Sequence, residues 1–88
     1  MNHRRIERTV KGFANHRRIQ IMELLWNNPE QSVDEIATNL KINFKTASEH
    51  IRRLAIAGLV LKRNEGNSVR HKLTTRAESI LKFLRILE

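Results

Sequence analysis

The residues whose chemistry stands out lie around a short apolar repeat between positions 44 and 54. Ala47, Ile51 and Leu54 recur at helical spacing and predict the buried face of a helix. The side chains that fall off this face are polar, charged or aromatic: Phe44, Lys45, Thr46, Ser48, Glu49, Arg52 and Arg53. Arginine and lysine can donate to phosphates or guanine edges, serine and threonine can bond either, and glutamate can accept from cytosine. This pattern favours a helix that reads nucleic acid over a face that is merely solvated.

A second basic set follows on a predicted β-hairpin. Its arms are residues 59–64 and 69–74, joined by residues 65–68, and on the second arm apolar and basic residues alternate as on a strand with one wet face. The candidate contacts on the arms and at the tip are Lys62, Arg63, Asn67, Arg70 and Lys72. Residues 41–76 hold nine Lys and Arg against two Glu, so they carry most of the net charge of +8. Charge concentrated on these two elements indicates a polyanionic partner.

The first twenty residues carry another cluster of positive charge. Glu7 alone offsets six basic side chains: Arg4, Arg5, Arg8, Lys11, Arg17 and Arg18. Two interpretations remain open at this point, contacts to phosphates that flank the main site and a face that only meets water.

The composition argues against several other classes of protein. The absence of cysteine excludes a disulfide scaffold, a thiolate zinc site and a cysteine nucleophile. No glycine-rich phosphate loop or nucleophile elbow is present, and Ser48 and His50 point to different sides of a helix, so we expect no enzyme. The four histidines are scattered, so we expect neither metal nor cofactor. Without an apolar run of roughly 18 to 20 residues or a signal-like start, the chain is expected to be cytoplasmic, with no membrane partner.

The order of the predicted elements places the two basic sets side by side. The 88 residues suit one domain, with a helix or arm over 1–12 and a buried helix from Asn15 that ends before Pro29. Ser32 and Glu35 form a capping box that opens a short helix, and residues 41–43 separate it from the helix that starts near Phe44. Gly58 is a plausible left-handed cap before the hairpin. Thr75 and Glu78 form another capping-box pattern, which opens a last helix over 75–88.

This order is that of a winged helix-turn-helix, mainly α with a β-hairpin wing, and the residues resemble a known family. From residue 14 to residue 74, about two thirds of the chain, the sequence is similar to the ArsR-like winged-helix regulators of bacteria and archaea. Residues 32–37 resemble the family's first helix-turn-helix element, 45–54 its recognition helix and 57–60 its junction into the wing. Metal-sensing members carry cysteines, or histidines and acids, where this chain has Val33, Ile36, Ser79, Lys82 and Arg85. The resemblance therefore implies DNA binding without a metal site.

The last helix carries more large apolar residues than one face of a small domain needs. We expect it to dimerise, with the first helix completing the surface, as in similar regulators. The proposed dimerisation residues are Ile6, Val10, Phe13, Ile80, Leu81, Phe83, Leu84 and Leu87. The alternative is that Leu81 and Leu84 only cover the core of the monomer.

These expectations add up to a transcriptional regulator that binds double-stranded DNA. Acting as a homodimer on an inverted repeat, it would read sequence with one helix per half-site, and repression is the expected sign. Two alternatives remain open: a winged-helix module that binds protein or RNA, and an architectural protein that coats DNA without sequence choice. The sequence points to no effector.

Overall fold

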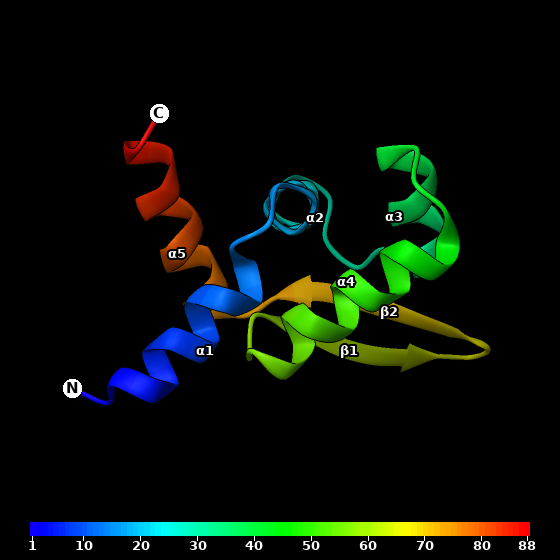
Figure 1. The fold of residues 1–88 in the computed structure, drawn as a ribbon. Helices are drawn as coiled ribbons and strands as arrows, with labels where there is room; N and C mark the ends of the chain where they lie inside the picture. The colour runs from blue at the N-terminus through cyan, green and yellow to red at the C-terminus, as the bar shows by residue number, and fades with distance from the viewer.

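Five helices and one antiparallel hairpin make up the computed structural model, which describes residues 1–88 (Figure 1). In chain order the elements are α1 (His3–Phe13), α2 (His16–Asn27), α3 (Val33–Leu40), α4 (Phe44–Ile56), β1 (Val60–Glu65), β2 (Ser68–Leu73) and α5 (Thr75–Ile86). Helices α1 and α5 lie at one end of the molecule and the hairpin tip lies at the other. The predicted order of elements is confirmed, and the first segment is a helix.

Each helix begins after an Asn, Ser or Thr whose side chain accepts a hydrogen bond from a backbone amide of the first turn. The capping box at α3 is confirmed: the Ser32 hydroxyl accepts from the Glu35 amide at 3.2 Å, and the Glu35 carboxylate accepts from the Ser32 amide at 2.9 Å. Lys41 then takes a left-handed conformation and Asn43 caps α4. These two residues set the tight turn between α3 and α4.

The start of α5 differs from the prediction by one residue. Thr74, rather than Thr75, is the N-cap, and its hydroxyl accepts from the Ala77 amide at 3.1 Å. The same hydroxyl donates to the carbonyl of Gly58 at 2.8 Å. Thr74 is favoured because its one side chain serves the helix and also ties α5 to the junction between α4 and β1. The predicted box of Thr75 and Glu78 is therefore wrong.

Both strands of the hairpin have the predicted length of six residues but lie one residue closer to the tip, so the turn is shorter than predicted. Pairing runs from Val60 opposite Leu73 to Glu65 opposite Ser68, so only Gly66 and Asn67 form the turn, in place of the predicted residues 65–68. Gly66 has a φ of +59°. Two-residue hairpin turns need a positive φ at this position, and glycine adopts it without strain. On the outer edge of β2, the backbone of residues 30–31 exchanges hydrogen bonds with His71 at 2.8 and 2.9 Å. The hairpin is thus held to the segment that leads into α3.

The core lies between α2, α4, α5 and the base of the hairpin. Helix α2, predicted to be buried, contributes Ile21, Met22 and Leu25. The other buried members of the cluster come from every later element: Ile36, Ile51, Leu54, Leu59, Val60, Leu73, Ala77 and Leu81. Helix α1 buries no residue completely and packs on α4. Because the inner face of α4 is fixed by this core, its opposite face is held outward in one orientation.

The close crossing of α1 and α4 yields a first stability prediction. A Cβ atom added at Gly12 would overlap the Cβ of Ala57. Alanine normally stabilises a helix interior by about 0.5 to 1 kcal/mol over glycine. Here we expect Gly12→Ala to lower the free energy of unfolding by about 1 to 3 kcal/mol, because the two helices must move apart. Urea denaturation measures the change.

The double variant Gly12→Ala/Ala57→Gly provides the control, since it removes the atom that the new methyl group meets. We expect the penalty of Gly12→Ala to shrink in this background. If the single variant Gly12→Ala is more stable than the wild type, the close crossing of α1 and α4 is contradicted.

Candidate nucleic-acid interface

The first two turns of α4 present the predicted reading residues. Phe44, Lys45 and Thr46 are exposed, while Ser48 is half-buried. The Thr46 amide donates to the Asn43 side chain at 2.7 Å, so this amide is already used by the cap. Helix α3 packs across α4, and the two form the helix-turn-helix. Lys45 takes part in none of the seven ion pairs of the chain.

Three of the predicted contact residues on α4 bind one another. The Glu49 carboxylate accepts from Arg52 Nε and a terminal nitrogen of the same guanidinium at 3.0 and 2.8 Å, and from Arg53 Nε at 3.0 Å. These hydrogen bonds, first from Arg52 and then from Arg53, lower the pKa of Glu49 to about 2, so it stays ionised at neutral pH. Glu49 holds the two arginines beside each other on the exposed face. Its own oxygens are occupied, which argues for a positioning role over the predicted contact to cytosine.

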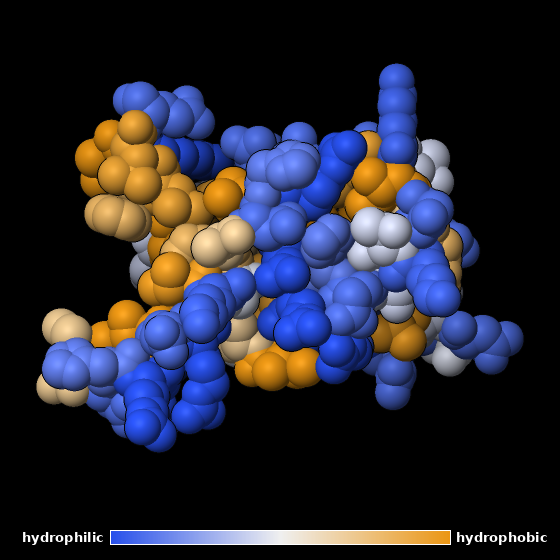
Figure 2. All heavy atoms as spheres, in the orientation of Figure 1, coloured by the Kyte–Doolittle hydropathy of each residue, from blue (hydrophilic) through white to orange (hydrophobic).

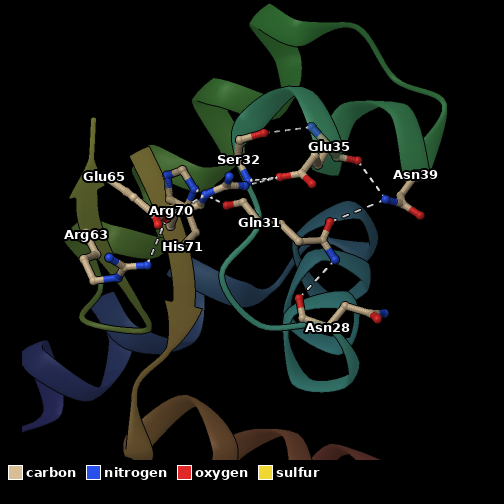
Figure 3. Close-up of polar contacts among 9 residues, drawn as sticks. All are labelled: Asn28, Gln31, Ser32, Glu35, Asn39, Arg63, Glu65, Arg70 and His71. Atoms are coloured by element: carbon tan, nitrogen blue, oxygen red, sulfur yellow. Dashed lines mark hydrogen bonds and ion pairs between the residues drawn. The ribbon is translucent and has the colours of Figure 1, made fainter. Parts of the chain in front are cut away.

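The basic residues of the wing, the β1–β2 hairpin, divide into two kinds. Arg63 donates to Glu30 at 2.6 Å and to Glu65 at 3.2 Å. Arg70 donates to Glu65 at 3.3 Å and to Glu35 at 2.7 Å (Figure 3). Arg63 and Arg70 face each other across the strands, so they form one ladder with their acids. Lys62 and Lys72 are exposed and take part in none of the seven ion pairs.

Glu35 joins the wing to the helix-turn-helix. One of its oxygens, Oε1, accepts from the Ser32 amide and also from Arg70 (Figure 3). The hydrogen bonds from Ser32, together with the positive charge of Arg70, lower the pKa of Glu35. The residue that completes the α3 cap thus also anchors β2. The sequence signalled the cap but not the anchor, because Arg70 is 35 positions away.

The tip of the wing reaches the N-terminal ends of both helix-turn-helix helices. A hollow of about 260 Å³ is lined by Ser32, Val33 and Asp34 before and in α3, Phe44 at the start of α4, and Asn67, Ser68 and Val69 of the wing. Asn67 is exposed at the turn, as predicted. Val69 was predicted on the inner side of the strand, but it lies beyond the core and is exposed. The reading helix and the wing tip therefore border one concave surface.

Arg18, which the sequence analysis named only as a member of the N-terminal basic cluster, has a structural role. Its Nε donates to His50 Nδ1 on α4 at 3.2 Å, and one terminal nitrogen donates to the carbonyls of Lys11 and Gly12 at 3.2 Å each. One side chain therefore binds α4 and the last carbonyls of α1. The partner of His50 therefore lies on α2, 32 positions away in the sequence.

Two histidines are held neutral by their surroundings. Burial, and next the positive charge of Arg18, lower the pKa of His50. His71 is 2% exposed, and its burial lowers its pKa although its hydrogen bond to the Gln31 carbonyl, 2.8 Å from Nδ1, opposes the shift. Because the unfolded chain takes up these protons near pH 6.5 and the native chain only at lower pH, acid in this range favours unfolding.

We therefore expect the free energy of unfolding to fall as the pH decreases from about 6.5, before the carboxylates titrate below about pH 4.5. Urea denaturation at about pH 7.5 and about pH 5.5 measures it. His50→Gln should flatten the dependence, and His3→Gln, at the exposed start of α1, should retain it. An unfolding free energy that stays constant between the two pH values would contradict these assignments.

The terminal helices form an apolar groove of about 510 Å³, the α1–α5 groove. Its apolar lining consists of Ile6, Val10, Phe13, Ile80 and Phe83, all of them predicted dimerisation residues. Figure 2 shows apolar side chains gathered over α5 and toward α1. Leu84 packs against the core, and Leu87 is exposed at the end of α5.

Leu81 does not belong with this group. It is 3% exposed and is a member of the core cluster, so it has no surface to offer a partner. The alternative interpretation from the sequence, that Leu81 covers the core of the monomer, is the one the structure supports.

The structure holds neither a cluster of metal ligands nor a membrane-spanning helix. No three His, Asp or Glu side chains gather as a metal ion would require. None of the helices combines the length and the apolar character needed to cross a bilayer.

Comparison with known proteins places the chain in a family. Residues 15–62 match the model of the bacterial regulatory proteins of the arsR family. The transcriptional activator HlyU of Vibrio cholerae is 34% identical over 76 residues, which cover 85% of this chain and 69% of HlyU. An HTH-type transcriptional regulator of Mycobacterium tuberculosis is 43% identical over 61 residues. Those residues make up 69% of this chain but only 26% of the mycobacterial protein, so the chain spans about a quarter of that relative.

Solved structures agree with the sequence matches. The solution structure of a homodimeric winged helix-turn-helix DNA-binding domain of Mycobacterium bovis, from a possible ArsR-family regulator, superposes with a TM-score of 0.86 at 31% identity. The match covers 94% of this chain and 77% of the mycobacterial one. HlyU of Vibrio cholerae superposes with a TM-score of 0.85 at 32% identity, over 98% of this chain and 94% of HlyU. The chain therefore belongs to the arsR family of bacterial regulatory proteins, which are DNA-binding transcriptional regulators built on a winged helix-turn-helix.

Proposed function

We propose that the protein is a homodimeric repressor that binds an inverted repeat in double-stranded DNA. The observation that carries the proposal is the shared surface of α4 and the wing tip, where exposed Phe44 lines the same hollow as Asn67. Lys45 and Thr46 follow Phe44 on α4 and are exposed as well. A helix with polar residues exposed at its start is the part of a helix-turn-helix that enters the major groove. In the proposed complex the wing beside it meets the adjoining DNA backbone.

The roles of the individual residues follow from their partners. Lys45, Lys62 and Lys72 form no ion pair within the chain, so they are free to neutralise phosphates. Arg52 is the candidate for guanine: Glu49 binds its Nε and one terminal nitrogen and holds it in place, and the edge formed by the two terminal nitrogens is left to donate two parallel bonds. Arg63 and Arg70 hold the wing against Glu30 and Glu35. Their effect on DNA binding is therefore exerted through the position of the wing.

The dimer is proposed on the α1–α5 groove. Ile6, Val10 and Phe83 are each at least 42% exposed in the single chain, and they line one continuous apolar surface. A second copy with the same groove is a self-complementary partner under two-fold symmetry. The homodimeric state of the Mycobacterium bovis domain supports this choice. Two recognition helices would then lie about 34 to 36 Å apart, one turn of DNA.

Selection of duplexes from a randomised pool tests the proposal. The purified protein is used to enrich bound duplexes, which are sequenced, and fluorescence anisotropy then compares the enriched duplex with a scrambled one. We expect an inverted repeat, bound more tightly than the scrambled duplex by about 10³-fold or more. Salt-sensitive binding with no enriched sequence would indicate an architectural protein instead. The absence of any duplex binding at low salt would indicate a module for protein or RNA.

Repression is proposed from occupancy. A dimer that covers one turn or more of a promoter excludes the transcription machinery from the same DNA. HlyU of Vibrio cholerae is an activator, so a reporter gene is needed to decide between repression and activation. With the enriched site placed over a promoter, we expect lower expression when the protein is present, and higher expression would overturn repression while leaving DNA binding intact.

A further inference from the structure

A strongly basic surface lies beside the reading face, at the junction of α1 with the C-terminal half of α4. It consists of two adjoining hollows of about 400 and 320 Å³, which share Arg8, Ile56 and Ala57. We call them the basic hollows. The cations that line them are Arg5, Arg8, Lys11, Arg18, Arg53 and Arg76, and no carboxylate lines either one. Figure 2 shows strongly hydrophilic side chains running from α1 to this part of α4.

The charges in the hollows are poorly compensated within the chain. Arg5, Arg8 and Arg76 take part in none of the ion pairs, and the pair of Lys11 with Glu7 is exposed at 3.8 Å. Arg53 shares Glu49 with Arg52. Cations concentrated in a concave surface repel one another and focus a positive potential outward, so the free protein is favoured to bind an anion there.

The location of the hollows indicates which anion they would bind. Ile56 follows Phe44 by twelve residues on α4, which is about 18 Å along the helix. The hollows therefore lie at the end of α4 opposite to its reading end. Arg5 and Arg76 also border the α1–α5 groove. In the proposed dimer the hollows of both subunits therefore approach the two-fold axis, over the centre of the inverted repeat.

We propose that the basic hollows bind backbone phosphates of the DNA between the two half-sites. This inference rests on the proposed function and adds a second contact region, centred on α1, to that of α4 and the wing. Guanidinium groups pair with phosphate through short, charge-assisted hydrogen bonds. Phosphate contacts carry no sequence information, so the hollows add affinity and orientation but leave the choice of bases to α4.

The test compares salt dependence of binding for two double variants. Arg8→Ala/Lys11→Ala removes two cations that lie outside the α1–α5 groove, at helix positions where alanine is well tolerated. The matched control, Lys82→Ala/Arg85→Ala, removes two exposed cations of α5 that lie over Trp26. Anisotropy titrations use the inverted-repeat duplex enriched by selection, a scrambled duplex of equal length, and salt from about 50 to 200 mM.

Each phosphate contact contributes about 0.9 to the slope of log affinity against log salt. For Arg8→Ala/Lys11→Ala we expect a slope shallower by about 2 to 4, since a dimer loses up to four contacts, with an unchanged ratio between the two duplexes. The control should keep the wild-type slope. Equal slopes for both double variants would overturn the proposal.

Two further comparisons separate a phosphate contact from effects that do not depend on charge, and this inference from the proposed function. Arg8→Lys/Lys11→Arg keeps both charges, so it should keep the wild-type slope, and a loss equal to that of the alanine variant would overturn the phosphate contact. If the wild-type protein shows no preference for the enriched duplex, the proposed function fails, and this inference fails with it. A clear preference with unaltered slopes in Arg8→Ala/Lys11→Ala overturns this inference alone.

Discussion

Phe83→Asp is expected to leave the fold of the single chain intact and to weaken its dimer at least about 100-fold. Phe83 is 57% exposed in the single chain, so a carboxylate at this position stays in water while the protein is monomeric. In a two-fold dimer the α1–α5 groove meets its own copy, and each substitution acts twice. Burial of a phenylalanine side chain contributes about 1.5 to 3 kcal/mol, and the buried charge adds a further penalty. Sedimentation velocity over a concentration series measures the dissociation constant.

Leu61→Asp is the matched control for this experiment. Leu61 is apolar and 52% exposed, but it lies on β1 in the wing and outside the groove. We expect the control protein to dimerise as the wild type does. A Phe83→Asp protein that still dimerises with wild-type affinity would show that the α1–α5 groove is not the dimer interface.

Arg52→Ala is expected to relax the choice of bases, because one bidentate donor is lost from each recognition helix. A good bidentate contact to a base discriminates by about 5- to 150-fold, and a dimer makes the contact twice. We expect the preference for the enriched duplex over the scrambled one to fall by about 10²-fold or more. Competition titrations against both duplexes measure the change in preference.

Arg52→Lys separates geometry from charge. Lysine keeps the charge but cannot form the planar pair of bonds, so most of the lost preference should persist. Lys62→Ala serves as the comparison on the wing, where the loss of a phosphate contact should weaken both duplexes about equally. If Arg52→Ala lowers the affinity for both duplexes equally, Arg52 is a phosphate contact and the reading residue lies elsewhere on α4.

The sequence predicted the parts of the fold that depend on local chemistry. The apolar spacing of α2 and α4, the reciprocal bonds of Ser32 and Glu35, and the left-handed Gly58 involve residues only a few positions apart. Thr74 shows the limit of such reasoning. Both Thr74 and Thr75 suit a cap, and the hydroxyl bond from Thr74 to the Gly58 carbonyl, sixteen residues away, decides between them.

The candidate site was predicted as a set of residue types, and its internal organisation was not. Periodicity placed Arg63 and Arg70 on the wing, but their acidic partners, Glu30 and Glu35, lie 33 and 35 positions away. The same holds for Arg18, which binds His50 across 32 positions. Such pairs depend on how helices and strands pack, so neither charge counting nor spacing along the chain reveals them.

Leu81 shows why apolar content overstates an interface. The last helix has two apolar sides, and helical spacing alone assigns neither of them to the core. The fold settles the matter, because α2 and α5 pack together with Leu81 between them and leave Phe83 outside. The proposed dimer surface is accordingly smaller than the apolar residues of α5 suggest.

Insertion of about five base pairs at the centre of the enriched inverted repeat tests the central claim most directly, since this is half a turn of DNA. We expect the insertion to turn the second half-site away from its recognition helix and to reduce the affinity to that of a single half-site. Anisotropy with the intact repeat, the expanded repeat and an isolated half-site provides the comparison. An expanded repeat bound as tightly as the intact one would contradict a dimer that holds two α4 helices one turn apart.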